Sequence, residues 1–145
     1  MSPERIERLQ GIVKRFRKAI DDSSEEISFL VSFRAFPRGA CGDASDMLGR
    51  FLNEIGEGPF EYVSGWRERQ SHAWLEGHDL TVDITADQFA DVYQSAIVTA
   101  DKSWHTHFVV EHSRTPGFDG CVDDHRADLE SAYRFILGKF NDQTH

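Results

Sequence analysis

Three residues of this chain have the types and the spacing that nucleophilic acyl chemistry needs. Cys41 lies in a glycine-rich stretch, His72 opens the run His-Ala-Trp-Leu-Glu, and Asp83 is the centre of Thr-Val-Asp-Ile-Thr. A thiol attacks a carbonyl carbon well when a base lies within hydrogen-bond reach and a third group holds that base in one tautomer. The three residue types can fill these three roles, so the sequence raises the hypothesis of a Cys-His-Asp triad.

A helix is predicted to begin at Cys41. Apolar residues recur at helical spacing from Ala44 to Ile55, and Gly56 is suited to end the helix. The N–H groups of the first turn would then point towards the Cys41 sulfur. Together with the positive end of the helix dipole, they favour a thiolate over a thiol.

His72 and Asp83 fall on two strand-like runs, 72–76 and 80–85, that are joined by the turn-like sequence Gly-His-Asp. Side chains alternate along a strand, so His72 and Trp74 share one face. If the register pairs His72 with Asp83, the two residues lie about 4.5–5.5 Å apart in the antiparallel ladder. Both side chains can then face the start of the helix.

The other elements must hold these residues in place. A first helix is predicted from Ser2 as N-cap, with Pro3 in its first turn and an apolar stripe that reaches Ile20. The segment 27–36 is apolar but irregular, and is interpreted as a short strand or a helical turn. The remaining expected elements are a strand over 60–66, a helical turn over 86–93, strands over 95–99 and 107–112, and a last helix capped by Asp123 or Asp124.

The order of helices, strands and a final helix predicts an α+β fold, an antiparallel sheet with helices gathered on one side. With 145 residues the chain is long enough to bury a core, and we expect residues 1–145 to form a single domain. Cys41 would lie where the helix meets the sheet.

Composition and charge exclude several classes of partner. The formal net charge of −9 argues against nucleic acid, which binds basic surfaces. No run approaches the roughly 20 apolar residues that span a membrane, and the N-terminal sequence lacks a signal-peptide core. Cys41 and Cys121 are expected to be a reduced pair. We therefore expect a cytoplasmic protein with no membrane or nucleic-acid partner, while its oligomeric state stays open.

Five short motifs, taken in order, resemble the core of the transglutaminase-like superfamily of papain-like cysteine enzymes. They are Gly-Ala-Cys-Gly-Asp-Ala-Ser, Leu-Asn-Glu-Ile-Gly, Tyr-Val-Ser-Gly-Trp, His-Ala-Trp-Leu-Glu and Asp-Ile-Thr. The resemblance covers about residues 39–89 and implies a papain-like core with Cys41 as nucleophile, His72 as general base and acid, and Asp83 as the residue that orients it. The interval from His72 to Asp83 is shorter than is common in that family, which indicates a minimal hairpin.

The activity that this resemblance implies is a cysteine-dependent hydrolase or acyl transferase. It would act on a peptide or protein amide, in the backbone or a glutamine side chain, through a thioester and without a cofactor. Hydrolysis is favoured over transfer and deamidation because water needs no second substrate site. The alternative from another class is a catalytically idle papain-like fold that serves as a protein-interaction module.

Trp74, Gln88 and His105 are the expected substrate-binding residues. Trp74 has a second interpretation as a core or cleft-wall aromatic, and Gln88 as a structural hydrogen-bonding residue. The thioester route also needs a second oxyanion donor besides the Cys41 N–H. Residues 32–34 and Gln88 are the candidates for it.

A zinc site is the remaining alternative. His105 and His107 form a His-x-His sequence, which on a strand would place both rings on one face. No Cys-x-x-Cys or His-Glu-x-x-His motif accompanies it, so no metal is expected. Further ligands would have come from His112, Cys121 and Asp123.

Overall fold

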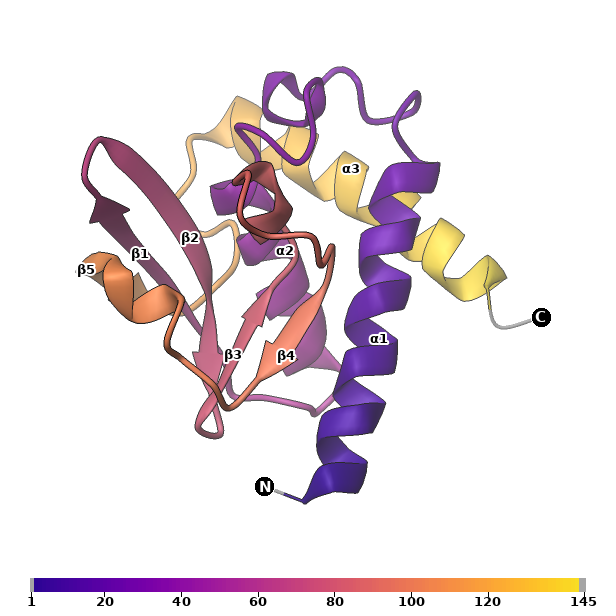
Figure 1. Cartoon of the computed structure of the whole chain (residues 1–145). Helices are drawn as coiled ribbons and strands as arrows, with labels where there is room; N and C mark the ends of the chain where they lie inside the picture. The colour runs from indigo at the N-terminus through magenta and orange to yellow at the C-terminus, as the bar shows by residue number, and fades with distance from the viewer. Residues whose placement is uncertain (1, 144–145) are drawn as a thin grey trace.

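The computed structural model describes residues 2–143. In these residues a five-stranded antiparallel sheet forms one layer, and three α-helices cover one of its faces (Figure 1). This architecture confirms the α+β class and the helices on one side of an antiparallel sheet. The helices are α1 (Pro3–Asp22), α2 (Cys41–Glu54) and α3 (Asp123–Asp142), and the strands are β1 (Glu61–Arg67), β2 (Gln70–Gly77), β3 (Leu80–Asp83), β4 (Ile97–Thr99) and β5 (Val109–Arg114).

The strand order is β4-β3-β2-β1-β5, so consecutive strands from β1 to β4 are neighbours. The hairpin between β2 and β3 turns at His78 and Asp79, whose φ angles are 53° and 60°. Positive φ at both central residues matches the twist of a two-residue hairpin, and Asp tolerates it better than most residues do. The turn that the sequence predicted between these strands is confirmed.

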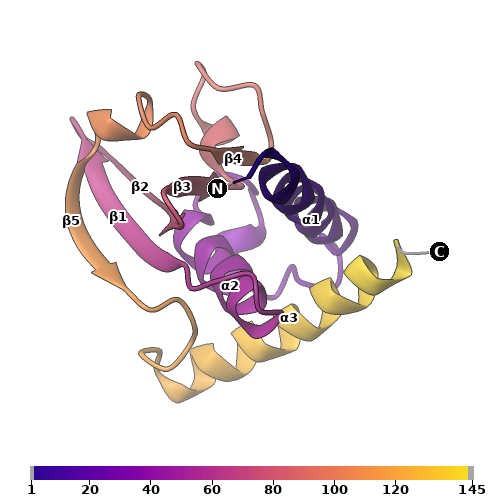
Figure 2. The ribbon, with the colours of Figure 1, turned by 90° about the horizontal axis from the view of Figure 1, so that it is seen from below.

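The helices pack in a layer behind the sheet. Figure 2 shows α2 between the sheet and α3, with α1 beside β4. Ser2 is the N-cap of α1, as predicted, and its hydroxyl accepts a hydrogen bond from the Arg5 N–H at 3.3 Å. The side chain of Gln10 in α1 bonds the backbone of Ala96 and Val98 and so satisfies part of the β4 edge. None of the helices within residues 2–143 is long and apolar enough to cross a membrane.

Two apolar clusters lie on opposite faces of the sheet. The larger one fills the space between sheet and helices and includes Leu75 and Val82. The smaller one, here called the outer-face cluster, lies on the other face. Trp74 belongs to the outer-face cluster and Leu75 to the larger one, which confirms the predicted alternation along β2. The outer-face cluster consists of Val63, Trp74, Phe89 and Phe108, with Trp104 packed against them.

Two local predictions were wrong, and a third had left two interpretations open. Residues 105–107 form a 3₁₀ helix, η3 (His105–His107), and the last strand begins only at Val109. That strand is exposed along its length and pairs only with β1, so the apolar pattern did not fix its bounds. Asp123 and Asp124 do not cap α3: its N-cap is Val122, and they lie in the first turn, where the helix dipole favours acidic residues. In the segment 27–36 the helical-turn interpretation is confirmed by η1 (Val31–Phe33), and no strand forms there.

Close packing of α2 on the sheet at Gly49 gives a first prediction. A Cβ added there would lie 2.5 Å from the Pro116 Cβ and 2.9 Å from the Leu75 Cδ2. We expect Gly49→Ala to lower the free energy of unfolding by about 1–3 kcal/mol, because α2 must move away from β2. Gly11→Ala in α1 is the control, because its added Cβ meets no described atom within 4 Å outside its own helix. That change should stabilise by about 0.5–1 kcal/mol. Urea denaturation measures both variants, and a stabilised Gly49→Ala would contradict the packing argument.

Candidate active site

His72 and Asp83 form a buried hydrogen-bonded pair on the outer face of the sheet. His72 Nε2 lies 2.7 Å from Asp83 Oδ2, and the side chains are 0% and 1% exposed. The register pairs Leu75 with Val82, so Asp83 is not directly opposite His72. The two residues are diagonal neighbours on one face, which a ring and a carboxylate can bridge. The sequence suggested that His72 and Asp83 could be direct partners across the two strands. In the structure they are diagonal neighbours instead.

The Asp83 carboxylate accepts three hydrogen bonds. Its Oδ2 accepts from His72 Nε2 and from His105 Nε2, both at 2.7 Å, and its Oδ1 accepts from the Thr85 N–H at 2.9 Å. Burial by itself would raise the pKa of Asp83, but the charge of His72 and the bonds from both rings lower it to about 2. Asp83 is therefore a carboxylate at neutral pH.

His72 is correspondingly a strong base. Burial by itself would lower its pKa, but the charge and the hydrogen bond of Asp83 raise it to about 9, with a smaller contribution from Cys41. At neutral pH the ring is therefore an imidazolium that is held by a carboxylate.

Cys41 is the first residue of α2, as the sequence predicted. The N-cap residue is Ala40, whose side chain makes no capping hydrogen bond, so the first-turn N–H groups face the region of the sulfur. Cys41 helps to raise the pKa of His72, so its sulfur lies near the ring. The structure thus brings together the three residues that the sequence analysis singled out.

Gln88 contacts the base. It ends the 3₁₀ helix η2 (Ala86–Gln88), and its Nε2 lies 3.0 Å from His72 Nδ1. An unprotonated Nδ1 accepts from this amide, whereas the charged ring carries hydrogen on both nitrogens and needs the amide oxygen instead. Rotation of the amide lets Gln88 pair with either state. Nδ1 is also the nitrogen left to exchange a proton with sulfur, because Nε2 faces Asp83.

Aromatic rings surround His72 and separate it from solvent. Trp74 is one of them: it is 2% exposed and its Nε1 donates to Glu76 Oε2 at 2.7 Å. Trp74 therefore forms a wall of the site. Its side chain has almost no exposed surface in this structure with which to make the predicted contact with substrate. The neighbouring ring centroids lie 5.1 Å (Phe89), 5.6 Å (Phe108), 5.8 Å (Trp74) and 5.9 Å (Trp104) from that of His72.

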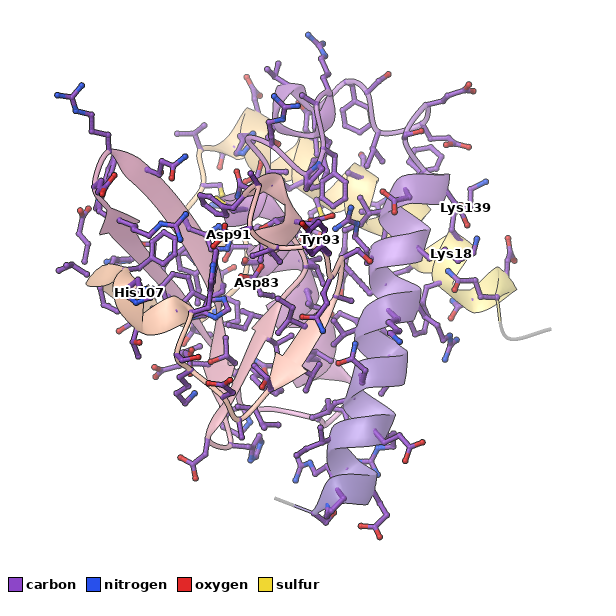
Figure 3. All side chains as sticks on the ribbon, viewed as in Figure 1. Lys18, Asp83, Asp91, Tyr93, His107 and Lys139 are labelled. Atoms are coloured by element: carbon purple, nitrogen blue, oxygen red, sulfur yellow. The ribbon has the colours of Figure 1, made fainter. Side chains whose placement is uncertain are left out.

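The His-x-His sequence does not form the zinc arrangement considered above. His105 is buried and faces Asp83, whereas His107, two residues later on η3, is exposed. Figure 3 shows Asp83 within the molecule and His107 at its rim. The two rings do not share a face because this segment is a 3₁₀ helix and not a strand. His105, a predicted substrate-binding residue, contacts Asp83 and also lines a cavity.

A second group of metal-ligand types consists of His72, Asp83 and His105, whose ligand atoms lie within 4.8 Å of one another. Two imidazoles and a carboxylate are common metal ligands. Here, however, both Nε2 atoms lie 2.7 Å from the same oxygen. That geometry places a hydrogen on each nitrogen, where a metal ligand must offer a lone pair. The contacts thus fit a carboxylate held by two N–H donors.

The candidates for a second oxyanion donor lie in different places. The Ser32 hydroxyl donates to Asp43 Oδ2 at 2.6 Å, in the first turn of α2, and Arg34 Nε donates to the Ser28 carbonyl. Both side chains are thus engaged elsewhere, whereas Gln88 forms a hydrogen bond with His72. A cavity of 980 Å³ between α1 and β4 reaches His105, but Cys41 is not among its lining residues.

His105 is the residue whose role the sequence analysis missed. It follows Asp83 by 22 residues, and no local motif links the two.

Comparisons with protein-family models, with curated proteins and with solved structures find no match to this chain.

Proposed function

We propose that this protein is a papain-like, transglutaminase-like cysteine hydrolase or acyl transferase that acts on amides. The observation that carries the proposal is the position of Cys41, at the N-terminus of α2 and beside a histidine whose far nitrogen is bonded to a buried carboxylate at 2.7 Å. The order of the sequence motifs supports the same family. In the proposal the chain is a single domain, needs no cofactor and works in the cytoplasm.

The chemistry follows from which nitrogen of His72 does not face Asp83, namely Nδ1. The Cys41 thiolate attacks the carbonyl carbon of the amide, and first-turn N–H groups of α2 stabilise the oxyanion that forms. His72 Nδ1 then gives its proton to the leaving nitrogen, the C–N bond breaks, and an amine and a thioester result. Water attacks the thioester while Nδ1 takes a proton from it. The C–S bond breaks, and the carboxylic acid and Cys41 are released.

Each contact of His72 suits this cycle. Asp83 keeps Nε2 protonated, so the tautomer that faces the sulfur through Nδ1 is fixed. The aromatic wall keeps water from the ring and thereby strengthens its interaction with the carboxylate. An imidazolium at neutral pH pairs with the thiolate and is ready to act as the acid of the first step.

The main alternative is an idle fold used as an interaction module. Burying a carboxylate with two imidazoles carries a desolvation penalty, and apolar residues of similar volume usually stabilise a fold at least as well. An idle module therefore has no physical need for Asp83, His72 and His105 at exposures of 4% or less. The buried carboxylate and its two histidines therefore favour the enzyme over the idle module.

Turnover of an amide panel tests the proposal. The panel combines peptides, proteins with accessible glutamines, and a primary amine as acyl acceptor. Product masses separate backbone hydrolysis, deamidation and amine incorporation. We expect Cys41→Ala to lose at least about 10³-fold in kcat for whichever substrate is turned over, because the nucleophile is gone. Cys121→Ala is the matched control and should keep the wild-type rate. Turnover that survives in Cys41→Ala would contradict the proposal.

A further inference from the structure

Asp83 Oδ2 has two histidine donors, and the proposed reaction uses only one of them. His105 Nε2 lies 2.7 Å from this oxygen, the same distance as His72 Nε2. The His105 side chain is 4% exposed, and its ring lies against Trp104 and Trp74, with ring centroids 4.7 Å and 5.1 Å away. His105 is thus as close to this oxygen as His72 is, and it is also buried.

Two donors on one oxygen weaken each other. Each N–H group draws electron density from the oxygen, so the second bond lowers the charge available to the first. The two bonds also come from different elements, β2 and η3, and with the Thr85 N–H on Oδ1 they restrain the plane of the carboxylate. His105 thus affects both the orientation of the Asp83 carboxylate and the strength of the hydrogen bond between Asp83 and His72.

We propose that His105 is a positioning residue of the triad, which fixes the Asp83 carboxylate and limits the basicity that Asp83 confers on His72. The inference deepens the proposed function and rests on it for its catalytic meaning. An acid that holds its proton too tightly gives it slowly to a leaving amine, and general acids work best with a proton affinity matched to the working pH. Without His105, His72 would be bound more strongly to Asp83 and would be a poorer acid.

The charged groups around His72 come from several elements. Asp83 on β3 and Cys41 on α2 both interact with the ring, and both raise its pKa. Arg67 on β1 carries a further charge. Its guanidinium lies 5.0 Å from the centre of the Phe89 ring, which belongs to the aromatic wall around His72. Phe89 is unchanged in the test below. Removal of His105 takes away its hydrogen bond to Asp83 and its electrostatic effect there, and it leaves these other charges in place.

The test is a ¹⁵N NMR titration of the His72 imidazole in the full chain, with the signal assigned by its loss in His72→Gln. His105→Phe keeps a ring between the tryptophans but removes the donor, and should move the His72 midpoint up by about 1 pH unit. His105→Gln keeps an N–H donor and should restore the wild-type midpoint. His107→Phe, on the same 3₁₀ helix but exposed, should leave it unchanged. A His105→Phe midpoint that stays or falls would overturn the proposal.

A measurement on the unaltered protein covers the case in which His105→Phe does not fold. The His105 ring should carry its hydrogen on Nε2, with a downfield proton that exchanges slowly with water. A ring with hydrogen on Nδ1 alone would overturn the proposal. The outcome is separable from the proposed function: an unreactive Cys41 contradicts the enzyme but leaves the His72 midpoints as expected. An unshifted midpoint in a reactive protein contradicts only the role of His105.

Discussion

Cys41 is expected to be alkylated by iodoacetamide at pH 6 on the order of 10- to 100-fold faster than Cys121, because thiolates react and thiols do not. The pKa of His72 is about 9, so at pH 6 its ring is an imidazolium near the Cys41 sulfur. Burial instead raises the pKa of the Cys121 thiol, and the charges of Asp46 and Asp43 raise it further. Both cysteines are free of disulfides, so both can be labelled in one sample.

Variants locate the source of this reactivity. His72→Ala removes the cation and should slow the labelling of Cys41 at pH 6 by about tenfold or more, while Cys121 labels as before. Peptide mapping across pH 5 to 9 gives both rates from the same digest. If the two cysteines label equally slowly and follow an ordinary thiol titration, Cys41 is not activated. The interaction-module hypothesis would then be the better one.

The second large effect is on stability, and Asp83→Asn should reverse its dependence on pH. In the wild-type protein the pKa of His72 rises from 6.5 to about 9 on folding. The resulting stabilisation is complete below pH 6.5 and is lost as pH rises through 9. It corresponds to roughly 3 kcal/mol. The pKa of Asp83 falls from 3.8 to about 2, so its share of the same interaction is complete above pH 3.8 and is lost as pH falls through 2.

Without the carboxylate charge, burial is the largest remaining influence on the pKa of His72, and Cys41 opposes it. Desolvation disfavours the charged ring, so the pKa of His72 in folded Asp83→Asn should lie below 6.5, and stability should be lost as pH falls. Between pH 6 and 9 the wild-type protein should lose stability with rising pH, whereas Asp83→Asn should not. Urea denaturation at unit intervals from pH 5 to 9 measures the two slopes.

Asp91→Asn is the matched control for this experiment. Asp91 is an exposed carboxylate that accepts from Trp104 Nε1, and its pKa is lowered mainly by that bond. It does not titrate between pH 6 and 9, so the wild-type slope should persist. A falling slope in Asp83→Asn equal to that of the wild-type protein would show that the ion pair with His72 does not govern stability.

Residue order along the chain determined the features that depend on neighbours. The start of α2 at Cys41, the turn at His78 and Asp79, and the opposite faces of Trp74 and Leu75 were all predictable, and the structure confirms them. Each depends on helical spacing, turn composition or alternation, which operate over a few residues. The α+β class followed from the order of such elements.

Only the tertiary structure decided which side chains of the candidate site contact one another and in which protonation states. The register of β2 on β3 made the contact of His72 with Asp83 diagonal, and the path of the chain after β4 carried His105 back onto the same oxygen. The pKa of His72 depends on burial and on a carboxylate from another strand, neither of which local sequence encodes. The sequence thus identified the residues with the right chemistry. Their protonation states and their partners were set by contacts between segments that are distant along the chain, because burial and charge act through space.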